Sequence, residues 1–261
     1  MRIHHLERDY RAIAEGLLGK PASLSRVEHT FENENVTVVT PGHTIVAMLL
    51  AQRISYNLHQ LAFAAWYPAV TKLGANRTTV HGIPRGLAPS GFGLPNSVLK
   101  ILKNRGAADD YLGFVDGNPS ALYRRHPALL DGHLELVRIV DNEYAKNMPD
   151  LYDIQRSITD RIPDCRIGNS AFTTIYLNKD IESRFHRDPV NLPDVPSVML
   201  PLGTFKGGNL VIPHYRLAFA YRPGDILLLN AHELHGTTAF KGQRLCAVFY
   251  CGGWAAIGPE L

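Results

Sequence analysis

Between residues 172 and 250 the chain consists of short apolar segments separated by turn residues, and this pattern limits the choice of fold more than any other feature. Glycine and proline separate the segments, most clearly at Gly207-Gly208 and at Arg222-Pro223-Gly224-Asp225. A series of short strands with turns between them predicts a β-sandwich or barrel. The predicted strands are residues 172–178, 197–202, 209–213, 216–221, 226–229 and 244–250.

The chain before residue 166 has longer apolar patterns that favour helices. Helices that precede a series of strands predict an α+β fold, in which the helices pack on one side of an antiparallel core. We therefore expect a single domain over residues 1–261, with a mostly helical part at 1–165 and a strand-rich core at 166–261. The predicted N-terminal elements are helices over 10–18, 43–66 and within 119–147, a strand over 36–40, and a connector over 149–163.

Composition and charge bear on the cellular compartment and the binding partners expected of the chain. No apolar run reaches the length that crosses a bilayer, and the first residues lack the apolar core of a signal peptide. Three cysteines, Cys165, Cys246 and Cys251, cannot all pair, which favours free thiols in a reducing compartment. An intracellular location, cytoplasmic or nuclear, is expected, with no membrane partner. The net charge of +3 is compatible with nucleic-acid contact without requiring it.

A histidine and an aspartate two positions apart suggest a metal site. His186 and Asp188 would point to the same side of an extended chain. His235, which ends a later predicted strand, would complete a set of two histidines and one carboxylate. Such a set holds non-haem Fe(II) and leaves positions for a bidentate cosubstrate and O2.

An arginine on the last predicted strand suits the same chemistry. Arg244 begins the apolar run that ends at Tyr250. A buried guanidinium beside a metal is well placed to grip a carboxylate with two hydrogen bonds.

The stretch from residue 172 to residue 250 resembles the iron- and 2-oxoglutarate-dependent dioxygenases with a double-stranded β-helix, or jelly-roll, fold. More narrowly, it is similar to the TET and J-binding-protein oxygenases in their phage and fungal branch. The chain departs from the family's pattern at residues 181–182 and 189–193, beside the pocket. The residues that carry the resemblance are 172–179, His186-x-Asp188, 207–216, 222–225, 232–238 and Arg244-Leu245.

The resemblance implies a reaction and its cofactors. His186, Asp188 and His235 would be the catalytic iron ligands, and Arg244 would bind 2-oxoglutarate, with O2 as the other cosubstrate and ascorbate as a reductant. Asn178 is a second candidate for hydrogen bonding the cosubstrate or the base. The implied activity is hydroxylation of the 5-methyl group of a pyrimidine base in DNA, either 5-methylcytosine or thymine.

Four further residues are candidate substrate contacts. Arg77 and Arg85 lie in a glycine- and proline-rich stretch, residues 74–93, that could hold a DNA backbone. His232 precedes His235 by three positions and could orient the metal site or contact substrate. His214 follows a glycine-rich strand and could lie at a solvated rim or contact DNA.

Two other functions stay open at this point. One is a dioxygenase of the same fold that acts on a free small molecule or an amino-acid side chain. The other is a jelly-roll binding module whose metal is structural or absent, against which the intact metal and arginine positions argue.

Overall fold

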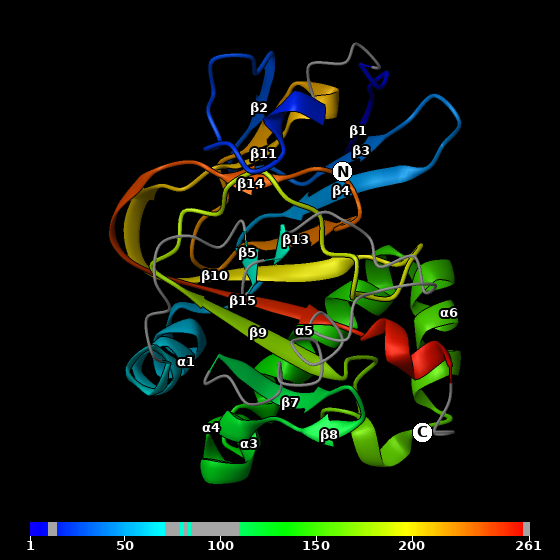
Figure 1. Cartoon of the computed structure of the whole chain (residues 1–261), viewed down its shortest axis with the longest axis vertical. Helices are drawn as coiled ribbons and strands as arrows, with labels where there is room; N and C mark the ends of the chain where they lie inside the picture. The colour runs from blue at the N-terminus through cyan, green and yellow to red at the C-terminus, as the bar shows by residue number, and fades with distance from the viewer. Residues whose placement is uncertain (10–14, 71–78, 81–82, 85–109, 258–261) are drawn as a thin grey trace.

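Two β-sheets form the centre of the protein, and helices cover the outer face of the larger one (Figure 1). The computed structural model describes residues 1–9, 15–70, 79–80, 83–84 and 110–257. The larger sheet has nine strands in the order β1-β3-β4-β13-β10-β15-β9-β7-β8. Along the chain these are β1 (Arg2–His5), β3 (Val36–Val39), β4 (Ile45–Leu50), β7 (Tyr111–Val115), β8 (Asn118–Pro119), β9 (Thr174–Lys179), β10 (Ser197–Gly207), β13 (Ile226–Leu229) and β15 (Phe240–Tyr250).

The smaller sheet has four strands in the order β14-β11-β12-β2. Its members are β2 (His29–Phe31), β11 (Leu210–Ile212), β12 (Leu217–Phe219) and β14 (Gly236–Thr237). From β10 to β15 the chain passes back and forth between the two sheets, and every pairing among these strands is antiparallel. This alternation is a double-stranded β-helix, so the α+β class predicted from the sequence pattern and the jelly-roll core implied by the resemblance are both confirmed.

The core strands are continuous apolar runs because the larger sheet is buried on both faces. In β13, Leu227 and Leu229 pack toward the smaller sheet, whereas Ile226 and Leu228 pack toward the helices. β15 alternates in the same way, which places Arg244 on the face with Cys246 and Val248, between the sheets.

The helical layer lies on the other face of the larger sheet. α1 begins after Ser55, whose side chain accepts a hydrogen bond from the backbone N–H of Leu58, and it buries Ala62 and Trp66. The helices of the described part are α1 (Tyr56–Ala69), α3 (Ala121–Arg125), α4 (Ala128–Asp131), α5 (Leu134–Asn147) and α6 (Pro149–Thr159). Short 3-10 turns are η1 (Glu15–Leu17), η3 (Pro163–Cys165), η4 (Pro213–Tyr215) and η5 (Gly253–Ala256).

Several predictions for the N-terminal half were wrong. The predicted helix over 43–66 is strand β4 followed by the start of α1, because a fully apolar run without a polar face fits a buried strand as well as a helix. The predicted connector over 149–163 contains helix α6, which starts at Pro149 as proline readily does in a first turn. The expectation that residues 1–165 are mostly helical fails over residues 1–55, where the described part forms four strands and no α-helix.

Other predictions fall partly or wholly outside the described residues. Of the predicted helix over 10–18, the described part contains only the turn η1. Most of the stretch 74–93 lies outside, apart from the two-residue strands β5 (Thr79–Val80) and β6 (Ile83–Pro84), which pair with each other.

Gly203 permits the close pairing of β10 and β15, and its replacement should destabilise the fold. Its φ is +105°, and a Cβ there would lie 2.3 Å from the carbonyl oxygen of Gln243. Gly203→Ala should therefore lower the free energy of unfolding by at least about 2 kcal/mol, measured by urea denaturation. Gly16→Ala is the matched control because a Cβ there meets no atom within 4 Å. Equal stability of the two variants would contradict this account of the β10–β15 pairing.

Candidate metal centre

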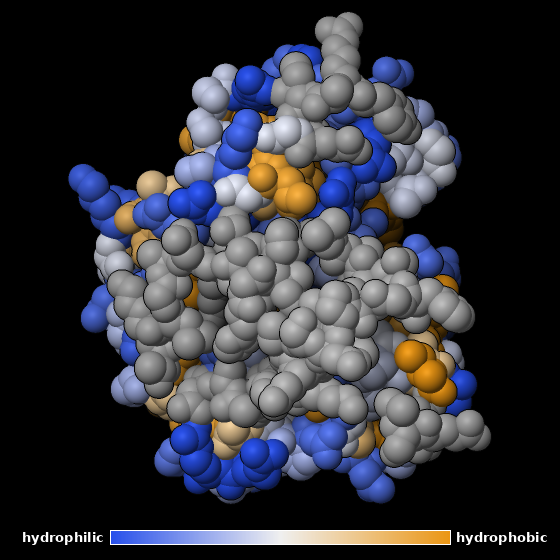
Figure 2. All heavy atoms as spheres, in the orientation of Figure 1, coloured by the Kyte–Doolittle hydropathy of each residue, from blue (hydrophilic) through white to orange (hydrophobic). Residues whose placement is uncertain are grey.

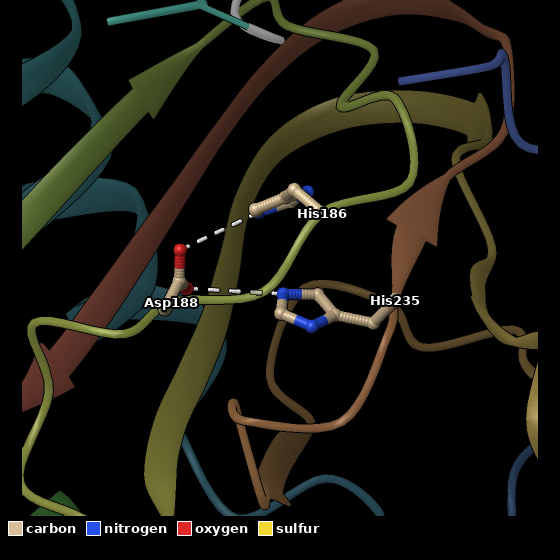
Figure 3. A group of neighbouring side chains, drawn as sticks. All are labelled: His186, Asp188 and His235. Atoms are coloured by element: carbon tan, nitrogen blue, oxygen red, sulfur yellow. Dashed lines mark ion pairs between the residues drawn. The ribbon is translucent and has the colours of Figure 1, made fainter. Parts of the chain in front are cut away.

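His186 and Asp188 follow β9 in the chain, His235 directly precedes β14, and the three side chains converge on one point (Figure 3). One potential ligand atom from each residue lies within 4.8 Å of the other two. The Nε2 atoms of His186 and His235 are 3.6 Å and 3.8 Å from the two carboxylate oxygens of Asp188. Both histidines are buried, and the Asp188 side chain is 26% exposed, so the group has one partly open side.

Backbone hydrogen bonds bring these distant residues together. His186 and His235 form an isolated antiparallel bridge, in which each N–H donates to the other's carbonyl at 2.8 Å and 2.9 Å. The N–H of Asp188 donates to the carbonyl of Ala231 at 2.9 Å. The positions of all three residues are therefore fixed by main chain as well as by side-chain packing.

The second ring nitrogen of each histidine is held by a carbonyl group. Nδ1 of His186 lies 2.7 Å from the carbonyl oxygen of Arg184, and Nδ1 of His235 lies 2.8 Å from that of Glu233. A carbonyl can only accept, so each Nδ1 carries a proton, which leaves Nε2 as the ring nitrogen that can coordinate a metal. Two neutral imidazoles and one carboxylate are the donor set that non-haem Fe(II) takes, so the residues present fit that ion.

The glycine after His235 allows close packing at this point. A Cβ on Gly236 would lie 3.0 Å from the carbonyl oxygen of Ser183 and 3.1 Å from the Cβ of Ala22. The segment that carries His235 thus runs directly against the segment that carries His186, with Ala22 of the N-terminal part beside them.

Arg244 lies inside the barrel, and its side chain has no acidic partner among the residues that the structure describes. It is 1% exposed, and its guanidinium carbon lies 5.3 to 5.6 Å from the ring centres of Phe205, Tyr221 and Phe240. Its Nε is buried without a hydrogen-bond partner. Gly208 makes room for it, since a Cβ there would lie 3.2 Å from Nε.

The polar neighbours of Arg244 are neutral. Its Nη2 donates to the hydroxyl oxygen of Tyr221, which lies 3.7 Å from the Cys246 sulfur. Burial raises the pKa of the Tyr221 phenol and of the Cys246 thiol, so neither neutralises the guanidinium near neutral pH. A buried cation with a free donor and no counter-ion is a suitable site for the carboxylate of a ligand.

The model of the oxygenase domain of the 2OGFeDO superfamily, the Tet_JBP family, matches residues 121–252, about half of the chain. The chain belongs to the Tet_JBP family. The match contains the three converging residues and Arg244, and it leaves strands β1–β4 and helix α1 outside.

Two relatives of this chain are JBP2 proteins, each named as a bifunctional helicase and thymine dioxygenase. The one from Trypanosoma brucei brucei is 30% identical over 124 residues, which are 47% of this chain and 11% of the relative. The one from Leishmania major is 25% identical over 206 residues, 76% of this chain and 17% of the relative. The chain thus spans a small part of the curated relatives that it matches.

One solved structure with a fold similar to this chain is NgTET1 in complex with 5mC DNA. It superimposes with a TM-score of 0.54 at 12% identity and covers 88% of this chain and 84% of that chain. At this identity the similarity establishes a shared fold.

Of the other residues predicted for the site, the structure describes Asn178, His232 and His214, and none of them belongs to the His186–Asp188–His235 group. Asn178 pairs with Cys246 across β9 and β15, so it lies on the same face as Arg244. His232 is not part of the metal group; its Nε2 lies 3.1 Å from the carbonyl oxygen of Asn191. Arg77 and Arg85 lie outside the described residues.

The rim position considered for His214 is wrong. Its side chain is 6% exposed, and its Nδ1 lies 3.2 Å from a carboxylate oxygen of Glu233. Arg8 approaches the same oxygen at 3.1 Å. Burial alone would raise the pKa of Glu233, but the hydrogen bond from His214 and the charge of Arg8 outweigh it, so the pKa lies below its usual value.

Sequence analysis missed Arg8, Glu233 and Tyr221, which surround the predicted site residues. Their contacts join positions far apart in the chain, and nothing in the local pattern marks the contact between Arg8 and Glu233. A polar residue inside the run Leu217–Arg222 is the one local signal, and it points to Tyr221.

The surface of the described part can be followed on one face of the molecule (Figure 2). On the face shown in Figure 2, the described residues are mostly hydrophilic, and apolar ones form small separate groups. Among the described residues, no helix combines the length and the apolar character that a membrane crossing requires.

Proposed function

We propose that this chain is an Fe(II)- and 2-oxoglutarate-dependent dioxygenase that hydroxylates the 5-methyl group of a pyrimidine base in DNA. The observation that carries the proposal is the pairing of two features in one barrel: the His186–Asp188–His235 group and the buried Arg244, whose Nε has no hydrogen-bond partner. The names of the relatives support the substrate class, since they are thymine dioxygenases and a protein crystallised with 5mC DNA.

His186, Asp188 and His235 would hold the iron, and Arg244 would bind the distal carboxylate of 2-oxoglutarate. Once bound, iron, 2-oxoglutarate and O2 supply the oxidising chemistry, and we propose ascorbate as the reductant that maintains Fe(II). Tyr221 would give the carboxylate a second donor, and Asn178, on the same sheet face, would contact the cosubstrate or the base. The aromatic cage around Arg244 keeps water from this end of the barrel, which strengthens the ion pair.

We propose that residues 1–261 work as a single catalytic domain. Strands β1, β3 and β4 lie in the same sheet as β9, β10, β13 and β15, and β2 completes the smaller sheet. Removal of the N-terminal strands would expose the edge of β13 and of β12, so the region matched by the family model depends on the rest of the chain.

The proposal is tested by asking which substrate stimulates cosubstrate turnover. Succinate formation from 2-oxoglutarate should rise on addition of DNA containing 5-methylcytosine or thymine, compared with DNA in which uracil replaces thymine and cytosine is unmethylated. Stimulation by free amino acids or small metabolites, without stimulation by either DNA, would favour the alternative substrate class instead.

DNA binding through Arg77 and Arg85 remains a prediction from the sequence. Binding to phosphates releases counterions, so affinity for DNA should fall steeply as salt rises. Neutralising both arginines should reduce the slope of log affinity against log salt by roughly two without changing 2-oxoglutarate binding. An unchanged slope in the double variant would contradict DNA binding through Arg77 and Arg85. The DNA would then be expected to bind on the side of Lys179, Arg184 and Arg187.

A further inference from the structure

Both metal-binding histidines are oriented by a residue two positions earlier in the chain. The carbonyl of Arg184 receives the Nδ1 proton of His186, and the carbonyl of Glu233 receives that of His235. The direction in which each Nε2 points therefore depends on where the backbone of Arg184 and of Glu233 is held.

The same N-terminal segment, residues 8–9 and 15–28, contacts both of these residues. Arg184 donates from Nη1 to the carbonyl oxygen of Gly19 at 3.1 Å. Glu233 receives a hydrogen bond from Nη2 of Arg8 at 3.1 Å. The two carbonyl-bearing residues are thus fixed by side-chain contacts to one stretch of chain that lies outside the family match.

Backbone bonds and apolar packing strengthen this arrangement. Phe185, between Arg184 and His186, exchanges two backbone hydrogen bonds with the segment: it accepts from Gly19 at 2.8 Å and donates to Lys20 at 2.9 Å. Its ring packs with Leu234, which precedes His235, and the partly buried members of that cluster come from the segment: Leu17, Leu18, Ala22 and Val27.

The two ends of the segment are tied to the turn η4. Arg216 donates to Asp9 at 2.8 Å and also pairs with Glu28. The N–H of Asp9 donates to the carbonyl of His214 at 2.7 Å, and the His214 ring lies against Glu233. The segment therefore lies as a fixed strap along the chain that carries both histidines.

We propose that this N-terminal segment is the positioning element of the metal centre, acting through Arg8 on Glu233 and through Gly19 on Arg184. The inference rests on the proposed function, because it takes the His186–Asp188–His235 group to bind a metal. Arg184 and Glu233 are positioning residues because their carbonyls orient the two histidine rings, and Arg8 is one because it holds Glu233.

Arg8→Ala is the direct test. The Arg8 side chain is 34% exposed and lines an open cavity of about 780 Å³, so its truncation leaves no closed void in the core. We expect the affinity for Co(II), titrated into the metal-free protein, to fall about tenfold, as for other partners that orient metal ligands. The visible absorption of bound Co(II) should also change, because the His235 ring gains freedom to rotate.

Matched variants separate positioning from general stability. Arg8→Lys keeps the charge and should bind Co(II) more tightly than Arg8→Ala does. Glu233→Gln alters the other partner of the Arg8–Glu233 contact and should also weaken Co(II) binding. Arg2→Ala removes another N-terminal arginine that pairs with a glutamate, Glu34, and should bind Co(II) like the wild type. The metal-free forms of Arg8→Ala and Arg2→Ala should have the same thermal unfolding temperature.

The outcomes are distinguishable from those of the proposed function. Wild-type affinity and an unchanged Co(II) spectrum in both Arg8→Ala and Glu233→Gln would overturn the positioning role alone. Co(II) binding that persists unchanged in His186→Ala would contradict the metal centre itself.

Discussion

Asp188→Ala is expected to abolish DNA-stimulated turnover of 2-oxoglutarate while the protein stays folded. The carboxylate is the one anionic member of the metal group, and the two imidazoles alone leave a divalent ion with no charge compensation. The loss should exceed the roughly 10- to 100-fold effects of residues that only orient ligands. The Asp188 side chain is 26% exposed, so its truncation leaves no closed cavity.

The measurement is succinate formation together with Co(II) titration and circular dichroism. Asp153→Ala is the control, since Asp153 is an exposed carboxylate on α6, away from the site. Full activity in Asp188→Ala, or equal loss in both variants, would contradict the role of this group.

Arg244→Lys is expected to raise the Michaelis constant for 2-oxoglutarate about tenfold or more, which corresponds to about 1.4 kcal/mol of binding. Lysine keeps the charge but loses the planar group that can hold a carboxylate with two hydrogen bonds and lie among Phe205, Tyr221 and Phe240. Because the distal carboxylate does not react, the interaction is the same before and during the reaction, so kcat should change less than KM.

Steady-state kinetics at varied 2-oxoglutarate check this expectation, with Arg222→Lys as control. Arg222 is half exposed and pairs with Glu32, and Arg216 is occupied by Asp9 and Glu28. Both of these cations already have acidic partners, which distinguishes them from Arg244. A KM that is unchanged in Arg244→Lys and raised in Arg222→Lys would indicate that 2-oxoglutarate binds at Arg222 and not at Arg244.

The strand-rich half of the fold could be predicted because its signals are local. Turn residues such as Gly207-Gly208 mark where strands end, and buried strands are apolar throughout. The convergence of His186, Asp188 and His235 could be predicted from the order of the predicted strands around them and from the resemblance that the neighbouring segments carry.

The N-terminal half could not be predicted in the same way because its structure depends on distant partners. Residues 45–50 form a strand because β13 lies beside them, a contact that a window of sequence does not contain. The placement of His214 is similar: a histidine after a strand is ordinarily exposed, and only Arg8 and Glu233 make burial favourable. The contacts of Gly19 with Arg184 and of Arg8 with Glu233 likewise join residues about 165 to 225 positions apart.

The central claim is most directly tested by mass spectrometry of nucleosides from DNA incubated with the protein, Fe(II), 2-oxoglutarate and ascorbate. The account predicts 5-hydroxymethyl pyrimidine nucleosides from DNA containing 5-methylcytosine or thymine, and none when 2-oxoglutarate is omitted or Asp188→Ala is used. Absence of any oxidised base, under conditions in which the wild-type protein binds both Fe(II) and 2-oxoglutarate, would contradict it.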